Sequence, residues 1–434
     1  MKKFTKVIQI VLSVALAAGI FVIGCGFAPA RLPRSCFIDG VNVSGMRLTE
    51  AQALLRGQME SALDGYSLTV RVGGRSYTFA PPTVYVKSDL SAVLARARKK
   101  SGAYTLQKEV CLKGEEETLR GICDDFYKKS CSAHFVFQPT EAQPFLYEAE
   151  VNGRYVDGAE LKARVRQALQ TGEREITLSP QTEVPSYTLE RAKEETYLIS
   201  TFTTRYDAGN VSRAHNIALA AGKISGSVLE AGQTFSFNAA AGPRTAANGY
   251  REAPIILDGE FVSGLGGGVC QVSTTVYNAA LLAGLTVEEY HPHSLAVGYV
   301  EPSFDAMVSG QRCDLKLRNE LGGKVYFVCR AGNGSLTVRI YGVRSQAVYI
   351  RESVVTARIA PPEPEIREGE TDAVLRAAKD GIKSEGYLIV REAGKPDRRV
   401  RLRRDSYASV QGILQQAPHT DDLIEESEEP LFIP

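Results

Sequence analysis

The sequence predicts a multidomain α+β protein: an N-terminal transmembrane helix, two small α+β units, a mixed α+β domain and a small β module. Three observations predict this class. A chain of 434 residues is long enough for several domains that each bury a core. Apolar residues change along the chain between helical spacing and strand alternation. Shifts in composition mark the boundaries between the parts.

Residues 1–30 are predicted to be a membrane anchor. Three lysines precede an uncharged stretch over residues 7–27. A helix rising about 1.5 Å per residue would carry that stretch across a bilayer core of roughly 30 Å. The lysines stay cytoplasmic under the positive-inside rule, so the bulk of this single-pass chain is expected to be extracytoplasmic. A signal peptide cleaved near Ala28 and Ala30, or lipidation at Cys25, are alternatives that give the same location.

The net charge bears on nucleic-acid binding, and the cysteines bear on disulfide formation. Lysine plus arginine (51) nearly balance aspartate plus glutamate (50), so the chain lacks the basic footprint of a nucleic-acid-binding protein. Eight cysteines with irregular spacing permit disulfides in an exported chain, but a chain of this size does not need them. We therefore predict no nucleic-acid partner and no particular disulfide, and the oligomeric state stays open.

Two successive segments, 31–125 and 126–198, have the pattern of one small α+β unit repeated. In the first, a helix-like run over residues 48–63 precedes strands that turn at Gly73-Gly74. In the second, a strand pair near Asn152-Gly153 precedes a helix over 158–171 and a strand over 175–178.

The rest of the chain divides into four parts. Residues 199–340 are richer in glycine, alanine and short polar motifs, and they are less charged than the flanking segments. Residues 341–365 are predicted to be a strand and a proline-rich linker, and residues 366–416 a small β module. The acidic tail, residues 417–434, has the composition of a disordered segment.

The strongest chemical signal is a glycine-rich loop that runs into a helix ending at Gly284, which places Cys270 at the N-terminus of that helix. Unpaired amides and the helix dipole favour a thiolate there and lower the pKa of the cysteine. The same amides could hold an oxyanion formed when the thiolate attacks a carbonyl. The loop residues assigned this role are Gly267, Gly268, Val269 and Gln271.

A base for this thiol is predicted downstream. The helix after Cys270 rises about 20 Å, and a returning strand over residues 285–290 covers a similar length. His291 and His293 should therefore return to the side of Cys270. Upstream, Arg213 and Arg244 are candidates to clamp a substrate carboxylate.

The same residues permit other interpretations. A nucleotide site is disfavoured because the glycine loop lacks a Gly-Lys-Ser/Thr ending. No three- or four-ligand metal spacing is visible, so neither a metal nor another cofactor is predicted. Cys270 could be an inert core thiol, His293 a satisfied histidine, and both arginines simple loop supports. His215 lies in a predicted helix over residues 212–223 and is treated as structural.

The run from residue 203 to residue 319 resembles the VanW domain. The matching motifs are residues 213–217, 232–238, 242–245, 249–250, 253–254, the Gly-Gly-Gly-Val-Cys-Gln-Val-Ser core at 266–273, 293–294 and 305–306. The duplicated unit is similar to a peptidoglycan-binding domain that precedes VanW domains, at residues 40–46. Residues 366–412 resemble a G5-type module, at Gly369, residues 379–381, Tyr387 and residues 394–395.

The resemblance implies work on the cell wall, with peptidoglycan peptide stems and glycan as partners and the membrane as anchor. It implies an L,D-transpeptidase that forms a thioester on Cys270, uses His293 as base and makes 3→3 cross-links. The alternative is a non-catalytic peptidoglycan-binding scaffold. The family is linked by name to glycopeptide resistance. Further substrate-binding candidates in the matched motifs are Asn216, Tyr250, Ser273, Asn278 and Asp305.

The sequence departs from the family pattern at three places. Ala231 stands where proline is usual, and Cys313 where a small residue is usual. Residues 302–305 replace a loop that usually carries glycine, so the Asp305 loop is expected to be shifted.

Overall fold

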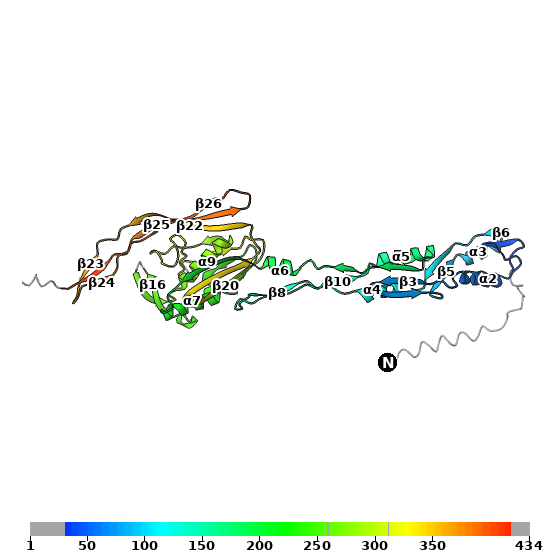
Figure 1. The fold of residues 1–434 in the computed structure, drawn as a ribbon, viewed down its shortest axis with the longest axis horizontal. Coiled ribbons are helices and arrows are strands. Elements are labelled where there is room, and N and C mark those ends of the chain that lie inside the picture. Colours follow the sequence, from blue (N-terminus) through cyan, green and yellow to red (C-terminus); the bar gives the residue numbers. More distant parts are fainter. Residues whose placement is uncertain (1–30, 258–259, 311, 418–434) are drawn as a thin grey trace, which may run out of the picture. The chain divides into compact units, whose positions relative to one another are not determined.

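The computed structural model describes residues 31–257, 260–310 and 312–417, and they form a mixed α+β protein with several cores (Figure 1). The described chain separates into two compact units. Unit 1 comprises residues 31–130 and 152–184, and unit 2 comprises residues 131–151 and 185–417. The anchor expected over residues 1–30 and the tail from residue 418 lie outside the described residues. No helix in the described ranges is long and apolar enough to cross a membrane.

Unit 1 contains four helices within its described residues, α2 (Leu48–Ser61), α3 (Leu90–Ala97), α4 (Glu115–Phe126) and α5 (Gly158–Thr171). Its strands are β1 (Cys36–Ile38), β2 (Val41–Asn42), β3 (Leu68–Val72), β4 (Arg75–Phe79), β5 (Val84–Ser88), β6 (Gly102–Tyr104), β7 (Lys108–Leu112), β10 (Gly153–Tyr155), β11 (Glu175–Leu178) and β12 (Gln181–Glu183). The sheet orders are β2-β1-β6, β11-β3-β4, β5-β7 and β10-β12.

Local signals explain where α5 begins and ends. The Asp157 side chain accepts the amides of Ala159 and Glu160, which satisfies two donors of the first turn. Gly172 ends the helix in the left-handed conformation, with φ 76°. The helix and the strand after it have the bounds that the sequence predicted.

The packing of unit 1 differs from the expected pair of separate units. Strand β11 pairs in parallel with β3, with Ile176 opposite Val70. Both residues lie in one apolar core with Val165 of α5 and Leu119 of α4. Segment 152–184 therefore completes the core of the preceding segment. The boundary expected between residues 125 and 126 does not separate two folded bodies, because the apolar faces on its two sides cover each other.

Unit 2 contains, within its described residues, the helices α6 (Leu189–Glu195), α7 (Val211–Ile224), α8 (Phe237–Ala241) and α9 (Val269–Ala283) and the 3₁₀ helix η1 (Ala246–Asn248). Its strands are β8 (His134–Phe137), β9 (Phe145–Glu148), β13 (Tyr197–Arg205), β14 (Val228–Leu229), β15 (Thr234–Ser236), β16 (Glu252–Leu257), β17 (Glu260–Leu265), β18 (Thr286–Glu289), β19 (Lys316–Arg318), β20 (Val325–Gly332), β21 (Ser335–Gly342), β22 (Ala347–Ile359), β23 (Glu365–Glu368), β24 (Ala373–Arg376), β25 (Gly381–Glu392), β26 (Arg398–Tyr407) and β27 (Ile413–Gln416).

The core of unit 2 is built around α9. This helix packs between the antiparallel sheet β13-β21-β20-β14 and strand β22, and α7 covers β20 of the same sheet (Figure 1). Its residues are buried all round, with Cys270 and Leu282 as exceptions. A helix with no polar face belongs in a core. Cys270 differs from most residues of this helix because its side chain is partly exposed to solvent.

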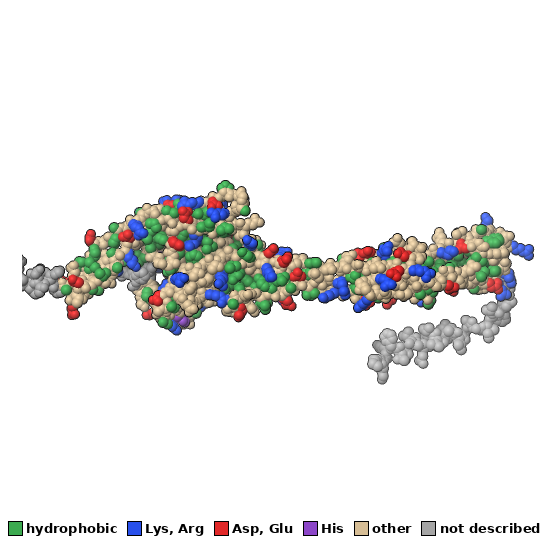
Figure 2. Space-filling view, in the orientation of Figure 1, with side chains coloured by type: hydrophobic (Ala, Val, Ile, Leu, Met, Phe, Trp, Pro, Cys, Tyr) green, Lys and Arg blue, Asp and Glu red, His purple; other side chains and the backbone are tan. Residues whose placement is uncertain are grey.

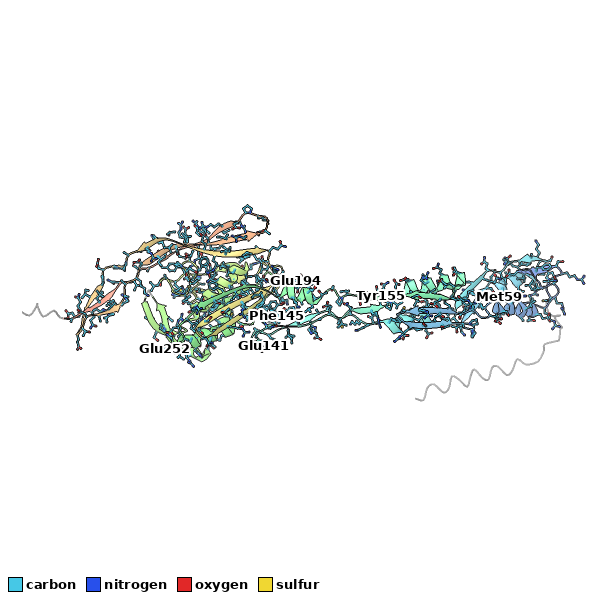
Figure 3. All side chains as sticks on the ribbon, in the orientation of Figure 1. Met59, Glu141, Phe145, Tyr155, Glu194 and Glu252 are labelled. Carbon is cyan, nitrogen blue, oxygen red and sulfur yellow. The ribbon has the colours of Figure 1, made fainter. Side chains whose placement is uncertain are left out.

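Aromatic packing explains why residues 131–151 belong to unit 2. Phe145 of the β8-β9 hairpin, labelled in Figure 3, packs edge-on against Tyr326 and Tyr341, with ring centroids 5.2 and 5.3 Å apart. Such contacts add to the burial of large apolar side chains.

The last strands of the chain are continuous with this core. Strand β22, 13 residues long, pairs with β25, and β25 pairs with β26. The segment expected to be a strand and linker thus belongs to the same sheet as the predicted β module. Strands β23, β27 and β24 form a second small sheet. Figure 2 shows basic and acidic side chains interspersed on the visible face of each unit.

Candidate active site

Cys270 is the second residue of α9, directly after the glycine loop, and its side chain is partly exposed. The loop is tight because it runs against β16, which begins at Glu252 (Figure 3), and against α7. A Cβ on Gly267 would lie 2.6 Å from the carbonyl oxygen of Pro254. A Cβ on Gly268, where φ is 105°, would lie 2.9 Å from Ile217. Only glycine fits both positions.

Asn216 secures this loop from α7. Its side-chain amide donates to the carbonyl oxygens of Gly267 (3.0 Å) and Arg251 (2.9 Å), and its oxygen accepts the amide of Arg251. Asn216 is fully buried. Sequence reasoning assigned it to substrate binding, but the structure gives it a supporting position behind the loop.

His293 lies between Cys270 and Asp305. Its Nδ1 is 2.7 Å from Asp305 Oδ2, and its backbone amide donates to the same oxygen at 2.7 Å. With Nδ1 held by the carboxylate, the other ring nitrogen is left for the hydrogen bond between His293 and Cys270. Cys270 Sγ also lies 3.4 Å from the carbonyl oxygen of Val308. The three side chains form a Cys-His-Asp arrangement, with Asp305 in place although its loop was expected to be shifted.

The electrostatics favour the charged form of this pair. Burial opposes ionisation of Cys270, but the hydrogen bond and charge of His293, together with Arg244, lower the pKa of the thiol. Burial lowers the pKa of His293, yet the hydrogen bonds to Asp305 and Cys270 outweigh it and raise that pKa to about 9. The two shifts act together, so each favours the charged form of its group: the thiolate of Cys270 and the imidazolium of His293.

Two residues of β26 hold Asp305, and sequence reasoning missed both. Tyr407 Oη donates to Asp305 Oδ1 at 2.6 Å. Arg403 donates to the backbone oxygen of Asp305 at 2.6 Å and to its Oδ1 at 3.2 Å. Arg403, Asp405 and Tyr407 alternate along the strand and are all buried. No pattern in the sequence distinguished them, because the residues between them, Arg404 and Ser406, are polar as well.

The two predicted clamp residues flank the thiol. Arg213 donates to the Gln271 side chain (2.7 Å) and Arg244 to the Asn238 side chain (2.6 Å). Burial lowers the pKa of both guanidinium groups, and the charge of Cys270 acts on both in the opposite sense. Within the described ranges neither arginine has a carboxylate partner within 4.0 Å, although both are partly buried. Such cations are suited to an anionic ligand.

Tyr299 is a further neighbour that the sequence did not indicate. It is hydrogen-bonded to Thr274, and burial followed by the charge of Cys270 raises the pKa of its hydroxyl. It therefore stays a neutral donor beside the thiol.

The structure places several other predicted site residues outside the Cys-His-Asp group. His291 bonds Glu289 at 3.0 Å, and Glu289 pairs with Lys316, so His291 is occupied elsewhere. The hydroxyl of Tyr250 donates to the backbone oxygen of Ala241. Both side chains are directed to other parts of the domain.

Ser273 and Asn278 project from α9 toward the segment before Val308. Ser273 donates to the carbonyl oxygens of Ala306 (2.6 Å) and Cys270 (3.0 Å). Asn278 donates to that of Phe304 at 2.8 Å. These bonds fix the segment that carries Asp305, so the two residues support the site from behind.

The amides available for an oxyanion differ from the set expected. Val269 donates to Gly266 and Gln271 donates to Gly268, each at 3.0 Å, so both amides are occupied. In the part of the chain that the structure describes, the amides of Gly267, Gly268 and Cys270 have no acceptor. The amide of Cys270 itself thus joins the glycine amides as a candidate donor.

No group of three or more His, Cys, Asp or Glu side chains is arranged to hold a metal within the described ranges. A cavity of about 640 Å³ lies elsewhere in unit 2, between α7, the ends of β20 and β21, and Pro139. None of the Cys-His-Asp residues lines it.

A known family and a known relative each match part of this chain. Residues 212–341 match the family described as VanW like protein. The uncharacterized protein YoaR of Bacillus subtilis (strain 168) is 38% identical over 146 residues, which are 34% of this chain and 48% of YoaR. The match thus spans about half the length of that relative.

Two solved structures have low similarity. The crystal structure of HP0197-G5 is matched over 99% of its length and 17% of this chain, with 23% identity and a TM-score of 0.10. A cysteine-to-serine mutant of an Enterococcus faecium L,D-transpeptidase is matched over 75% of its length and 48% of this chain, with 9% identity and a TM-score of 0.17. These scores are too low to establish a shared fold.

Proposed function

Because this chain carries a VanW-like domain over residues 212–341, we propose that it acts on peptidoglycan at the cell surface as a cysteine-dependent L,D-transpeptidase. The observation that carries the proposal is the Cys270-His293-Asp305 arrangement. It combines a thiol of lowered pKa, a charged imidazole and a buried carboxylate that orients the imidazole. Those are the parts that a thiol acyltransferase needs.

In the first half-reaction the Cys270 thiolate attacks the carbonyl carbon of the peptide bond before a terminal D-alanine in a stem tetrapeptide. The amides of Gly268 and Cys270, which have no acceptor in the described part of the chain, would bind the oxyanion. His293 donates its proton to the leaving amine, the C–N bond breaks, and D-alanine departs. The product is a thioester between the stem and Cys270.

In the second half-reaction the side-chain amine of another stem attacks the thioester. His293, now neutral, takes the amine proton, the C–S bond breaks, and the thiolate is restored. The product is a 3→3 cross-link. If water attacks instead, the protein is a carboxypeptidase with the same first half-reaction.

Arg213 and Arg244 are proposed to bind the carboxylate of the terminal D-alanine. Both flank Cys270, and neither has a carboxylate partner among the described residues. A guanidinium can bind a carboxylate with two parallel hydrogen bonds, which would orient the scissile bond beside the thiol.

The location belongs to the same proposal. Residues 1–30 would anchor the chain so that both units face the cell wall, and unit 1 together with the C-terminal strands would hold glycan near the site. Linked binding modules raise the local concentration of substrate in this way. Peptide stems and glycan are therefore the proposed partners.

The alternative is a non-catalytic peptidoglycan-binding scaffold. The observation in its favour is that most of the chain lies outside the VanW-like domain. In that case the glycine loop and the arginines would recognise peptide stems without cleaving them.

The direct test is analysis of muropeptides after incubation of the full-length chain with purified sacculi. We expect release of D-alanine and new 3→3 cross-links, both absent with Cys270→Ser. Cys131→Ser is the matched control, because Cys131 is an exposed free cysteine in unit 2 outside the site. Products that persist unchanged in Cys270→Ser would rule out the cysteine mechanism and leave the scaffold.

A further inference from the structure

We infer that the C-terminal sheet completes the active site: Arg403 and Tyr407 of β26 are positioning residues that fix Asp305 and, through it, His293 and the Cys270 thiolate. The inference rests on the proposed role of Cys270 as nucleophile. Strands β25 and β26 lie in the segment that resembles a G5-type module. According to the inference, they also support the active site of the VanW-like domain that precedes them.

The guanidinium of Arg403 connects two carboxylates and a backbone carbonyl. Its Nε and Nη2 bond the two oxygens of Asp405 at 2.7 and 3.0 Å. Its Nη1 donates to the backbone oxygen of Asp305, and Nη2 also reaches Asp305 Oδ1. The Arg403 and Asp305 side chains are each only 1% exposed. A planar group bound at this many points fixes both the main chain and the carboxylate of Asp305.

Tyr407 ties the same loop at a second point. Its hydroxyl donates to Asp305 Oδ1 at 2.6 Å and accepts the amide of Ser303 at 2.8 Å. Ser303 has φ 65°, a left-handed conformation that costs energy for a residue with a side chain. Its hydroxyl bonds that of Ser384 in β25 at 2.8 Å. Contacts from β25 and β26 therefore hold the loop in a conformation that it would not keep alone.

The loop also lies directly on the sheet. A Cβ on Gly386 of β25 would lie 2.8 Å from the backbone oxygen of Ser303. Arg403 lies over the ring of Tyr290, 4.5 Å from its centroid, three residues before His293. Strand β26 thus contacts the segment that carries the carboxylate and the segment that carries the imidazole.

The charges explain why this support matters for reactivity. Burial alone would raise the pKa of Asp305, whereas His293, Arg403 and Tyr407 act together to lower it. If the β26 contacts weaken, Asp305 holds a proton more readily or moves away from His293. The imidazolium is then less stable, and Cys270 loses part of the charge that favours its thiolate.

The test compares Tyr407→Phe with Tyr387→Phe in the full-length chain. Each removes one hydroxyl from the same sheet, but the hydroxyl of Tyr387 donates to Glu385, a residue of its own strand. The measurement is the rate of alkylation of Cys270 by iodoacetamide between pH 5 and 9, read by mass spectrometry. Loss of one hydrogen bond predicts a profile shifted to higher pH, with a rate at pH 6 about 2- to 10-fold lower in Tyr407→Phe. Tyr387→Phe should follow the wild type.

Arg403→Lys is a second variant. It keeps the positive charge but loses the guanidinium group that bonds Asp305 and Asp405, so it should shift the alkylation profile in the same direction. Thermal unfolding is recorded for every variant. A merely structural role would lower the melting temperature and leave the alkylation profile of the folded protein in place. Profiles of Tyr407→Phe and Arg403→Lys that coincide with those of the wild type and Tyr387→Phe would overturn the inference.

Failure of the inference and failure of the proposed function give different results. If sacculi show no new cross-links while the two profiles shift, the transpeptidase proposal fails and the positioning of the thiolate stands. If wild-type protein forms cross-links and the profiles coincide, the function stands and the inference is lost.

Discussion

The backbone amide and the Nδ1 atom of His293 both bond one oxygen of Asp305, Oδ2, at 2.7 Å. This double contact fixes the position of the ring and keeps a proton on Nδ1. The second carboxylate oxygen is taken by Tyr407 and Arg403. Asp305 is thus fully engaged, with one oxygen for the histidine and one for β26.

Asp305→Asn should remove this control of the imidazole. An amide of the same shape carries no charge and can donate its NH2 group to Nδ1. The proton of the neutral imidazole then lies on the other ring nitrogen, the one that bonds Cys270. By analogy with the corresponding change in serine-protease triads, we expect cross-linking to fall by about 10³- to 10⁴-fold. Alkylation of Cys270 near neutral pH should slow as well. Asp380→Asn, at an exposed position of unit 2, is the control, and equal rates in the two variants would contradict the prediction.

The pH dependence should separate nucleophile from acid. Alkylation of Cys270 should rise with pH at values below the usual range for thiols, because the pKa of Cys270 is lowered. Cross-linking should fall as pH rises through about 9, where His293 loses the proton that the leaving amine needs. Alkylation should not fall there. Loss of both rates together at about pH 9 would argue against His293 as the acid.

The same pair should make stability depend on pH. The pKa of His293 is raised in the folded protein, so its contribution is fully present below about pH 6.5 and is lost as pH rises through about 9. Thermal unfolding of wild type and His293→Gln, followed from pH 6 to 10, should therefore show a difference that shrinks with rising pH. A constant difference would mean that His293 does not carry this charge.

Gly267→Ala adds only one methyl group, but it should destabilise the domain and shift the glycine loop. The added Cβ would lie 2.6 and 2.7 Å from the carbonyl oxygens of Pro254 and Ala253. Overpacking of this kind costs about 1–3 kcal/mol, and a shifted loop would also slow alkylation of Cys270. Gly298→Ala is the control in the same domain, because a Cβ there meets nothing within 4 Å. Equal unfolding midpoints in urea for both variants would contradict this account.

Arg244→Gln should weaken binding of stems that end in a free carboxylate. Loss of a charge-assisted hydrogen bond is worth about 1.5–3 kcal/mol, so KM should rise roughly 10- to 150-fold. A stem ending in a carboxamide should bind the variant and the wild type alike. Arg251→Gln, at an exposed side chain of the same domain, is the control. An equal loss for the acid and the amide substrates would show that Arg244 does not read the carboxylate.

Local signals in the sequence indicated that the segment carrying His291 and His293 returns to the side of Cys270. The glycine loop fixes the start of the helix, and the matched lengths of the helix and the returning strand bring the histidine back. Spacing alone did not distinguish His293 from His291. That choice depends on Asp305 and Glu289, which bond one histidine each. The catalytic role of the pair remains a proposal.

Long-range pairing was not predictable from spacing. Arg403 and Tyr407 lie about a hundred residues after Asp305, beyond a segment expected to be a linker. The pairing of β3 with β11 likewise joins segments more than a hundred residues apart. Apolar alternation predicts that each segment is a strand, but it does not predict which strand pairs with it. Any other strand with the same alternation could pair at that edge and bury the same face.

The chain passes between its two units three times, after residues 130, 151 and 184. A protease that cuts at one of these places would leave both units joined by the other two connections. The segment freed at the cut would stay packed in the core of its own unit. Because the units are connected at three places, a single cut does not detach either unit from the other.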